Sequence, residues 1–238
     1  MKFDTFDFQQ TKNWLKPHHK KDVLALIENC FNGVSADGYF DKYFSSDLCF
    51  ERKLRLYYSH GECVGYCLIT FLKKQKDVLL KASAAFYPKY RKGGNTFSFA
   101  ITQAFRYWIN HPFQSIFYAD TMLSPAMYRA TAKKAAIAWP SLKSTSPARL
   151  FEKFNAKGNI SKKLELRCLK QVDRTTNYSF IDIKRFKESK KPEIAFYCKV
   201  NPDFDKGTAL FVIIPISLKQ FYLTALHTLK LRFNNKSS

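Results

Sequence analysis

At residues 86–96 the chain has the sequence FYPKYRKGGNT, which leaves an apolar strand, turns through two adjacent glycines and opens a helix. Adjacent glycines permit a sharp turn and let the backbone approach a ligand closely. The first turn of a helix directs unpaired N–H groups and the positive end of the helix dipole toward one point. Arg91 and Lys92 add formal charge there, so the pattern favours an anion such as phosphate. An ordinary Gly-Gly turn before a helix is the alternative.

The segments before this turn predict two helices followed by an antiparallel meander. Apolar residues at helical spacing are followed by Gly33, and the period then changes to strict alternation with polar turns between the runs. The predicted elements are helices over 18–32 and 39–44 and strands over 53–58, 63–71 and 78–87.

The segments after the turn continue a single α+β domain. We expect a core over 1–139, a basic insertion over 140–191, and C-terminal strands and a helix over 192–238 that complete the same domain. The predicted elements are a helix over 95–110, a buried strand over 115–119, a helix from Ser124 to about Trp139, strands over 193–200 and 208–216, and an amphipathic segment over 219–233. The apolar run over 209–214 is expected to pair beside 115–119.

With these elements in place, the turn resembles the acyl-CoA-binding motif of the GNAT superfamily of N-acetyltransferases. In that family the pattern is apolar-x-Pro-x-x-Arg-x-x-Gly-x-Gly/Ala, and this chain supplies Phe86, Pro88, Arg91 and Gly94, with Thr96 where Gly or Ala is usual. The order of elements over about 18–139 is similar as well. The resemblance implies a GNAT-like central mixed, mostly antiparallel sheet flanked by helices, with a basic C-terminal extension.

The resemblance also implies a binding site for acetyl-CoA or another acyl-CoA. The pyrophosphate would lie on backbone amides over 92–96, and the pantetheine arm would pair like an extra strand with the backbone of 85–87. Arg91 would open the loop, with its side chain either structural or in contact with a phosphate. The Thr96 side chain could crowd the pyrophosphate. The implied cofactor-binding residues are Ala85, Phe86, Tyr87, Arg91, Lys92, Gly93, Gly94, Asn95 and Thr96.

Two catalytic residues are expected by the same resemblance and by position. Tyr128 matches the tyrosine that protonates the departing CoA thiolate in the family, and the alternative is a core tyrosine at helical spacing with Ala132 and Ala135. Asp120, which ends the short strand, is the best-placed carboxylate for a general base, and the alternative is a cap of the next turn. Other candidates for the base are Glu51, Glu62, His60 and His111.

The charge of the chain points to anionic partners. Its 40 Lys+Arg against 19 Asp+Glu give +21, and residues 143–191 alone carry 14 basic and 5 acidic side chains with aromatic residues between them. That segment could bind nucleic acid, or its aromatic residues could fill a core of its own. The leading function is N-acyl transfer to a primary amine on a protein or other macromolecule. An inactive GNAT-like scaffold and a basic nucleic-acid-binding protein are the alternatives, and the oligomeric state is not indicated.

Cysteine usage and hydropathy suggest a reducing compartment. The six cysteines include no C-x-x-C pair and have no spacing suited to zinc, so free thiols are expected. The first residues have no apolar leader, and the longest apolar run, 209–218, is half of a membrane span and contains Pro215. We expect a cytoplasmic protein without transmembrane segments, and the composition leaves delivery into another cell open.

Overall fold

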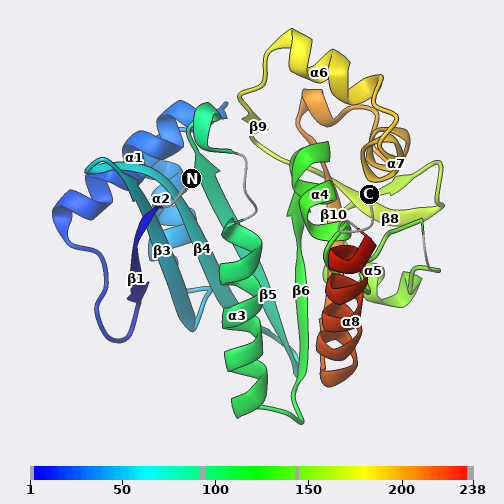
Figure 1. Cartoon of the computed structure of the whole chain (residues 1–238), viewed down its shortest axis with the longest axis horizontal. Coiled ribbons are helices and arrows are strands. Elements are labelled where there is room, and N and C mark those ends of the chain that lie inside the picture. Colours follow the sequence, from blue (N-terminus) through cyan, green and yellow to red (C-terminus); the bar gives the residue numbers. More distant parts are fainter. Residues whose placement is uncertain (1–2, 92–94, 143–144, 235–238) are drawn as a thin grey trace. The chain divides into compact units, whose positions relative to one another are not determined.

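The computed structural model describes residues 3–91, 95–142 and 145–234 (Figure 1). The chain forms two compact units, Met1–Gln114 and Ser115–Ser238. This division falls inside the expected core over 1–139, and the expected limits at 139 and 191 stay predictions. Both units combine helices with antiparallel strands, so the α+β class is confirmed.

The first unit is built on the meander that alternation predicted. Its strands lie in the order β1-β3-β4-β5, and the three neighbouring pairs are antiparallel. The edge strand β1 was not predicted, because its Asp and Thr positions make the segment look like a polar terminus. The elements are β1 (Asp4–Gln9), α1 (Pro17–Cys30), β2 (Phe31–Asn32), α2 (Ala36–Phe40), the π-helix η1 (Asp41–Ser45), β3 (Glu51–Ser59), β4 (Glu62–Lys74), β5 (Asp77–Phe86), the 3-10 helix η2 (Pro88–Tyr90) and α3 (Asn95–Asn110).

Helices cover both faces of this sheet. On one face the ring of Phe44 in η1 packs edge-on against Tyr66 of β4, whose hydroxyl bonds to Ser83 of β5. On the other face Tyr107 of α3 packs against Phe71 of β4. Successive residues of a strand point to opposite faces, so β3 directs Leu54 and its alternate neighbours to the first face. The residues between them point to the α3 face.

The second unit is organised around β10, most of whose residues are buried. Its strands lie in the order β6-β10-β8-β7, and Ile213 of β10 stands opposite Ala119 of β6, which confirms the expected pairing. The elements are β6 (Ser115–Met122), α4 (Pro125–Ala132), α5 (Ala148–Phe154), β7 (Asn159–Ser161), β8 (Leu166–Gln171), β9 (Thr175–Thr176), α6 (Phe180–Lys187), α7 (Pro192–Val200), the 3-10 helix η3 (Phe204–Lys206), β10 (Thr208–Ile216) and α8 (Leu218–Asn234).

The expectation of a strand over 193–200 was wrong. The segment is the helix α7, in which Ile194, Tyr197 and Val200 recur every three residues on the buried side. A short apolar run does not reveal its period, and here Pro192 in the first turn was the signal for a helix.

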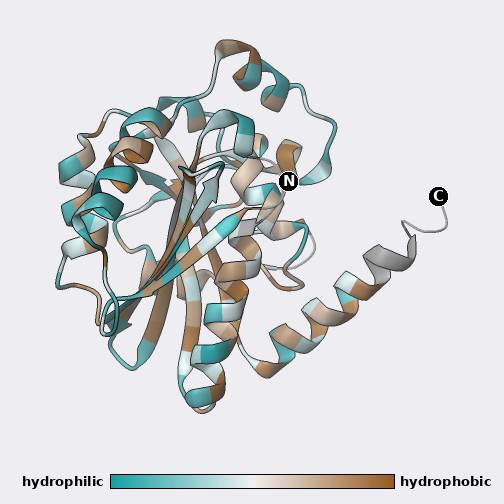
Figure 2. Cartoon of the chain, turned by 60° about the vertical axis from the view of Figure 1, so that its left-hand side comes forward, coloured by the Kyte–Doolittle hydropathy of each residue, from teal (hydrophilic) through white to brown (hydrophobic). Residues whose placement is uncertain are grey.

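The expected helix at the end of the chain is present as α8, and hydrophobic and hydrophilic residues are interspersed along its coloured part (Figure 2). All six cysteines are free. Among the described residues, no helix is both long and apolar enough to span a membrane.

Candidate functional site

The turn that follows β5 has the strand–turn–helix geometry that the sequence predicted. β5 ends at Phe86, the 3-10 helix η2 occupies 88–90, and α3 begins at Asn95. The amide of Tyr90 donates to the carbonyl of Tyr87 at 2.8 Å, which tightens the turn. Lys92, Gly93, Gly94 and the side chain of Asn95 lie outside the described residues.

Arg91 holds this turn against the end of the strand. Its Nε donates to the carbonyl of Phe86 at 3.0 Å, and the thiol of Cys30 in α1 donates to the same oxygen at 3.3 Å. Burial raises the pKa of the Cys30 thiol, and the neighbouring Arg91 partly offsets the increase. The Arg91 side chain was expected either to be structural or to contact a phosphate, and its bond to the Phe86 carbonyl is a structural contact.

The backbone expected to pair with pantetheine is partly engaged already. The Phe86 carbonyl has its two donors, and the amide of Tyr87 donates to the carbonyl of Val64 at 3.2 Å. Ala85 is buried and stands opposite Tyr66 of β4. An extended ligand at this segment would therefore use the remaining backbone groups.

The first turn of α3, which begins at Asn95, is suited to binding an anion. A helix N-terminus leaves its first amides without intrahelical partners, and negative charge is stabilised there. The carbonyl of Thr96 accepts from the thiol of Cys67 on β4 at 3.9 Å, which ties this turn to the sheet. The Thr96 side chain is half-buried.

Asp120 lies within β6 and does not end it. The strand runs to Met122 because Asp120 pairs opposite Val212 of β10, so the ladder continues beyond the expected end at 119. The residue is half-buried, and its Oδ1 accepts from the amide of Thr121 at 2.8 Å. No turn follows directly, so the alternative role as a turn cap does not apply.

Tyr128 lies in α4, which starts as predicted with Ser124 as N-cap and Pro125 in the first turn. Its side chain is 2% exposed, and its hydroxyl donates to the carbonyl of Pro140 at 2.9 Å. Burial, with a smaller contribution from the negative charge of Glu193, raises the pKa of this hydroxyl well above that of a free tyrosine. These contacts are those of a core tyrosine, and the role of proton donor stays a prediction.

The other candidates for a general base have local partners or lie in turns. The Glu51 carboxylate accepts from Gln9 and Thr11, and His111 Nδ1 lies 2.9 Å from the carbonyl of Tyr107. His60 lies in the exposed turn between β3 and β4, and Glu62 is the exposed first residue of β4.

Among known proteins, similarity to this chain is found only with solved structures. No family model and no curated protein matches the chain. An acetyltransferase of the GNAT family from Streptococcus pneumoniae is 15% identical, with 55% of this chain and 83% of that chain covered and a TM-score of 0.36. The ribosomal-protein-S18-alanine N-acetyltransferase from Escherichia coli is 9% identical, with 90% and 96% covered and a TM-score of 0.37. An acyl-CoA N-acyltransferase from Pseudomonas aeruginosa is 14% identical, with 60% and 93% covered and a TM-score of 0.39.

The similar structures are acyltransferases. At these identities and TM-scores the similarity supports no inference about the activity, substrate or site residues of this chain. A functional proposal therefore depends on the turn after β5 and on the motif that the sequence carries there.

Proposed function

We propose that this chain binds acyl-CoA at the turn between β5 and α3 and transfers the acyl group to a primary amine. The observation that carries the proposal is the succession of strand, 3-10 turn and helix at the residues where the acyl-CoA motif requires them. Arg91 supports it by fixing the turn to the carbonyl of Phe86, so the amides that follow it start from a defined strand end.

Acyl-CoA supplies an acyl group activated as a thioester. In the proposed reaction, Asp120 takes a proton from the ammonium form of the acceptor, so that the neutral nitrogen can attack the thioester carbon. The new C–N bond forms as the C–S bond breaks, Tyr128 donates its proton to the leaving thiolate sulfur, and the proton that the new amide nitrogen loses returns to the Tyr128 oxygen. For this step the Tyr128 hydroxyl must exchange its bond to Pro140 for one to the sulfur.

We propose an amine on a protein or another macromolecule as the acceptor, on the strength of the net charge of +21. Nucleic-acid binding by the basic segment has less support, because Phe151 and Phe154, two of the rings that could stack on bases, are buried in α5.

The first test is calorimetric titration with acetyl-CoA and with longer acyl-CoAs, combined with thermal unfolding. Acetyl-CoA at ~100 times Kd should raise the free energy of unfolding by roughly 2.7 kcal/mol. Gly94→Glu should abolish the effect because it adds bulk and negative charge where the motif binds pyrophosphate. Gln75→Glu, at the exposed turn between β4 and β5, adds the same charge away from the motif and should leave binding intact.

Turnover is then measured by chromatography of the released CoA, because the protein's own six thiols would react with a thiol reagent. Release that depends on an added amine supports the transferase. Binding without release from a panel of peptide and small-molecule amines favours the inactive scaffold. Failure of every acyl-CoA to bind, or equal binding by Gly94→Glu, overturns the proposal.

A further inference from the structure

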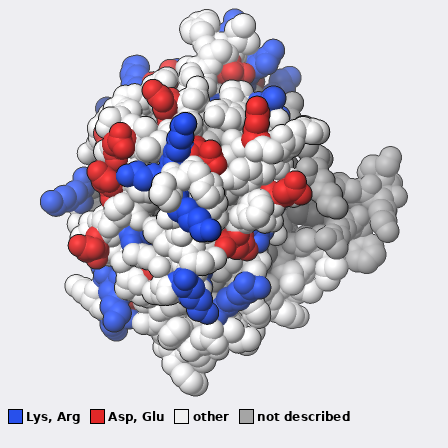
Figure 3. All heavy atoms as spheres, turned by 90° about the vertical axis from the view of Figure 1, so that its left-hand side faces the viewer, with Lys and Arg blue, Asp and Glu red and all other residues white. Residues whose placement is uncertain are grey.

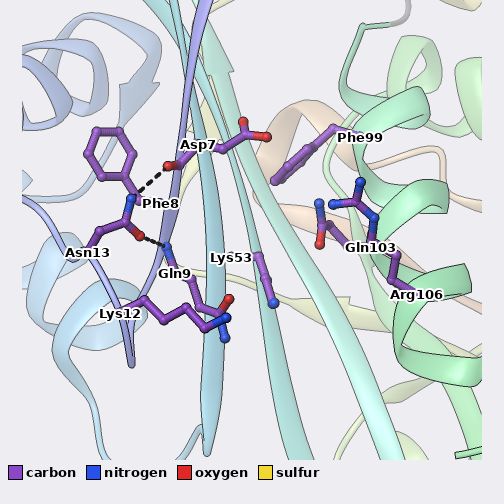
Figure 4. Close-up of a pocket in the computed structure, with 9 residues that line it drawn as sticks. All are labelled: Asp7, Phe8, Gln9, Lys12, Asn13, Lys53, Phe99, Gln103 and Arg106. Atoms are coloured by element: carbon purple, nitrogen blue, oxygen red, sulfur yellow. Dashed lines mark hydrogen bonds between the residues drawn. The ribbon is translucent and has the colours of Figure 1, made fainter. Parts of the chain in front are cut away.

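A second candidate binding site lies in the first unit, between β1, β3 and α3 (Figure 4). It is a cavity of about 170 Å³, and its polar lining includes Gln9, Lys12, Lys53, Gln103 and Arg106. Gln103 and Arg106 lie 8 and 11 residues beyond the start of α3, which places them roughly 12 and 16 Å along the helix axis. The cavity is therefore separate from the turn proposed for acyl-CoA.

Strand pairing explains why charged residues meet here. Gln9 stands opposite Lys53, and Asp7 opposite Arg55, so these four side chains share the sheet face on which α3 lies. The Arg55 guanidinium lies over the ring of Phe99 in α3 at 4.7 Å. A face next to a packed helix is usually apolar, and charge placed there costs desolvation unless it has a partner.

The cavity has more positive than negative charge. In the part of the chain that the structure describes, the side chains of Lys12, Lys53 and Arg106 have no ion pair or hydrogen bond. The acidic residue of the lining, Asp7, is neutralised by Arg55 through two bonds of 2.6 and 2.7 Å. The nearby Glu51 is a hydrogen-bond acceptor for Gln9. Four cations thus face two carboxylates, an excess that a dianion would balance.

Gln103 provides the second observation. Its residue is 5% exposed, yet its amide has no hydrogen-bond partner among the described residues. Figure 4 shows the amide on the cavity side of α3, beside Arg106. Because this amide lines the cavity and has no partner within the described part of the protein, a bound acceptor oxygen can take the hydrogen bond of its NH2 group.

We infer that this cavity binds the phosphate group of a small molecule. Lys53 and Arg106 supply charge, and the Gln103 amide nitrogen donates a hydrogen bond to a phosphate oxygen. The volume corresponds to about five or six water molecules, which suits a phosphate on a short organic group.

The test is a titration of the full chain with inorganic phosphate, followed by NMR of the Gln103 side-chain amide signals, at constant ionic strength maintained with chloride. Gln103→Met assigns the signals by removing them. We expect a saturable shift, and Lys53→Gln should weaken the affinity about tenfold. Lys76→Gln removes the same charge at the exposed turn between β4 and β5 and should leave the affinity unchanged.

Glycerol 3-phosphate forms a second arm, because tighter binding than that of inorganic phosphate identifies a phosphorylated organic ligand. Equal or weaker binding assigns the site to free phosphate. A shift that does not saturate would overturn the proposed site, and so would one that Lys53→Gln and Lys76→Gln reduce equally. Either result would mean that phosphate acts by general electrostatic screening. A shift caused by a single-stranded oligonucleotide but not by phosphate would instead assign the surface to nucleic acid. Because phosphate binding here needs no acyl-CoA, Gly94→Glu should leave it intact, so the two proposals can fail separately.

Discussion

The hydroxyl of Tyr128 has a structural contact and a proposed chemical role. It donates to the carbonyl of Pro140, a bond inside the second unit that helps to hold the segment after α4. The proposed reaction needs the same proton for the thiolate. Stability and turnover respond differently to loss of the hydroxyl, so both have to be measured.

Replacing Tyr128 with Phe should lower the free energy of unfolding by about 1 kcal/mol, because the buried Pro140 carbonyl loses its donor. If the hydroxyl also protonates the thiolate, kcat should fall by about 100-fold or more while KM for acyl-CoA stays the same. Urea denaturation and initial rates measure the two effects. Loss of stability with an unchanged kcat would assign Tyr128 to the core alone.

At the scale of elements, α4 shows tertiary contacts overriding a helical pattern. Spacing predicts a helix to about Trp139, whereas α4 ends at Ala132. Beyond it, the amide of Ile137 donates to Oε1 of Gln220 in α8, and Nε2 of Gln220 donates to the carbonyl of Ile137. Trp139 then exchanges two backbone hydrogen bonds with Ile213 of β10. The backbone groups of Ile137 and Trp139 are satisfied by these partners, so a longer helix offers them no gain.

Gln220→Met should therefore destabilise the protein although it preserves the volume of the side chain. Both polar groups of Ile137 lose their partner at a site where Gln220 is 4% exposed, and we expect a loss of about 2 kcal/mol or more. Lys219→Met changes the exposed neighbour on the same helix and controls for added hydrophobicity. Equal midpoints in urea for the two variants would contradict a structural role for Gln220.

The sequence predicted the elements whose information is local. The meander, the start of α3 at Asn95 and the Ser124 cap follow from alternation, turn residues and capping chemistry. It did not predict features that depend on partners distant in the chain. One such feature is the end of α4, which is set by contacts with α8. The cavity was also missed, although Lys53 and Arg55 alternate with the buried Leu54, and Phe99, Gln103 and Arg106 recur at helical spacing. Those two patterns meet only through the packing of α3 on the sheet, where the Arg55 guanidinium lies over the Phe99 ring.

At the scale of the whole molecule, the distribution of charge matters as well as the net charge of +21. On the face shown in Figure 3, acidic side chains are interspersed with the basic ones. Binding of a polyanion needs a continuous basic track, whereas a single phosphate needs only a local cluster. A local site therefore agrees better with this face than a nucleic-acid groove does.

The thiols of both units predict how stability depends on pH. Burial raises the pKa of Cys63 and Cys168 from the ordinary 9.0 to about 12, and that of Cys198 to about 11. A raised pKa means that the folded protein keeps a proton which the unfolded chain releases. The stability that each thiol contributes is therefore complete below pH 9 and is lost as pH rises from about 9 to 12.

Cys168→Ala tests this linkage at a side chain that is fully buried. Above pH 9 the free energy of unfolding of the wild type should fall more steeply than that of the variant, by up to about 1.4 kcal/mol per pH unit. The packing cost of the substitution shifts the whole curve by a constant, and lysines and tyrosines titrate in both proteins, so neither changes the difference in slope. Urea denaturation in the presence of a reductant measures both curves. Parallel curves between pH 9 and 11 would show that Cys168 titrates alike in the folded and unfolded chains.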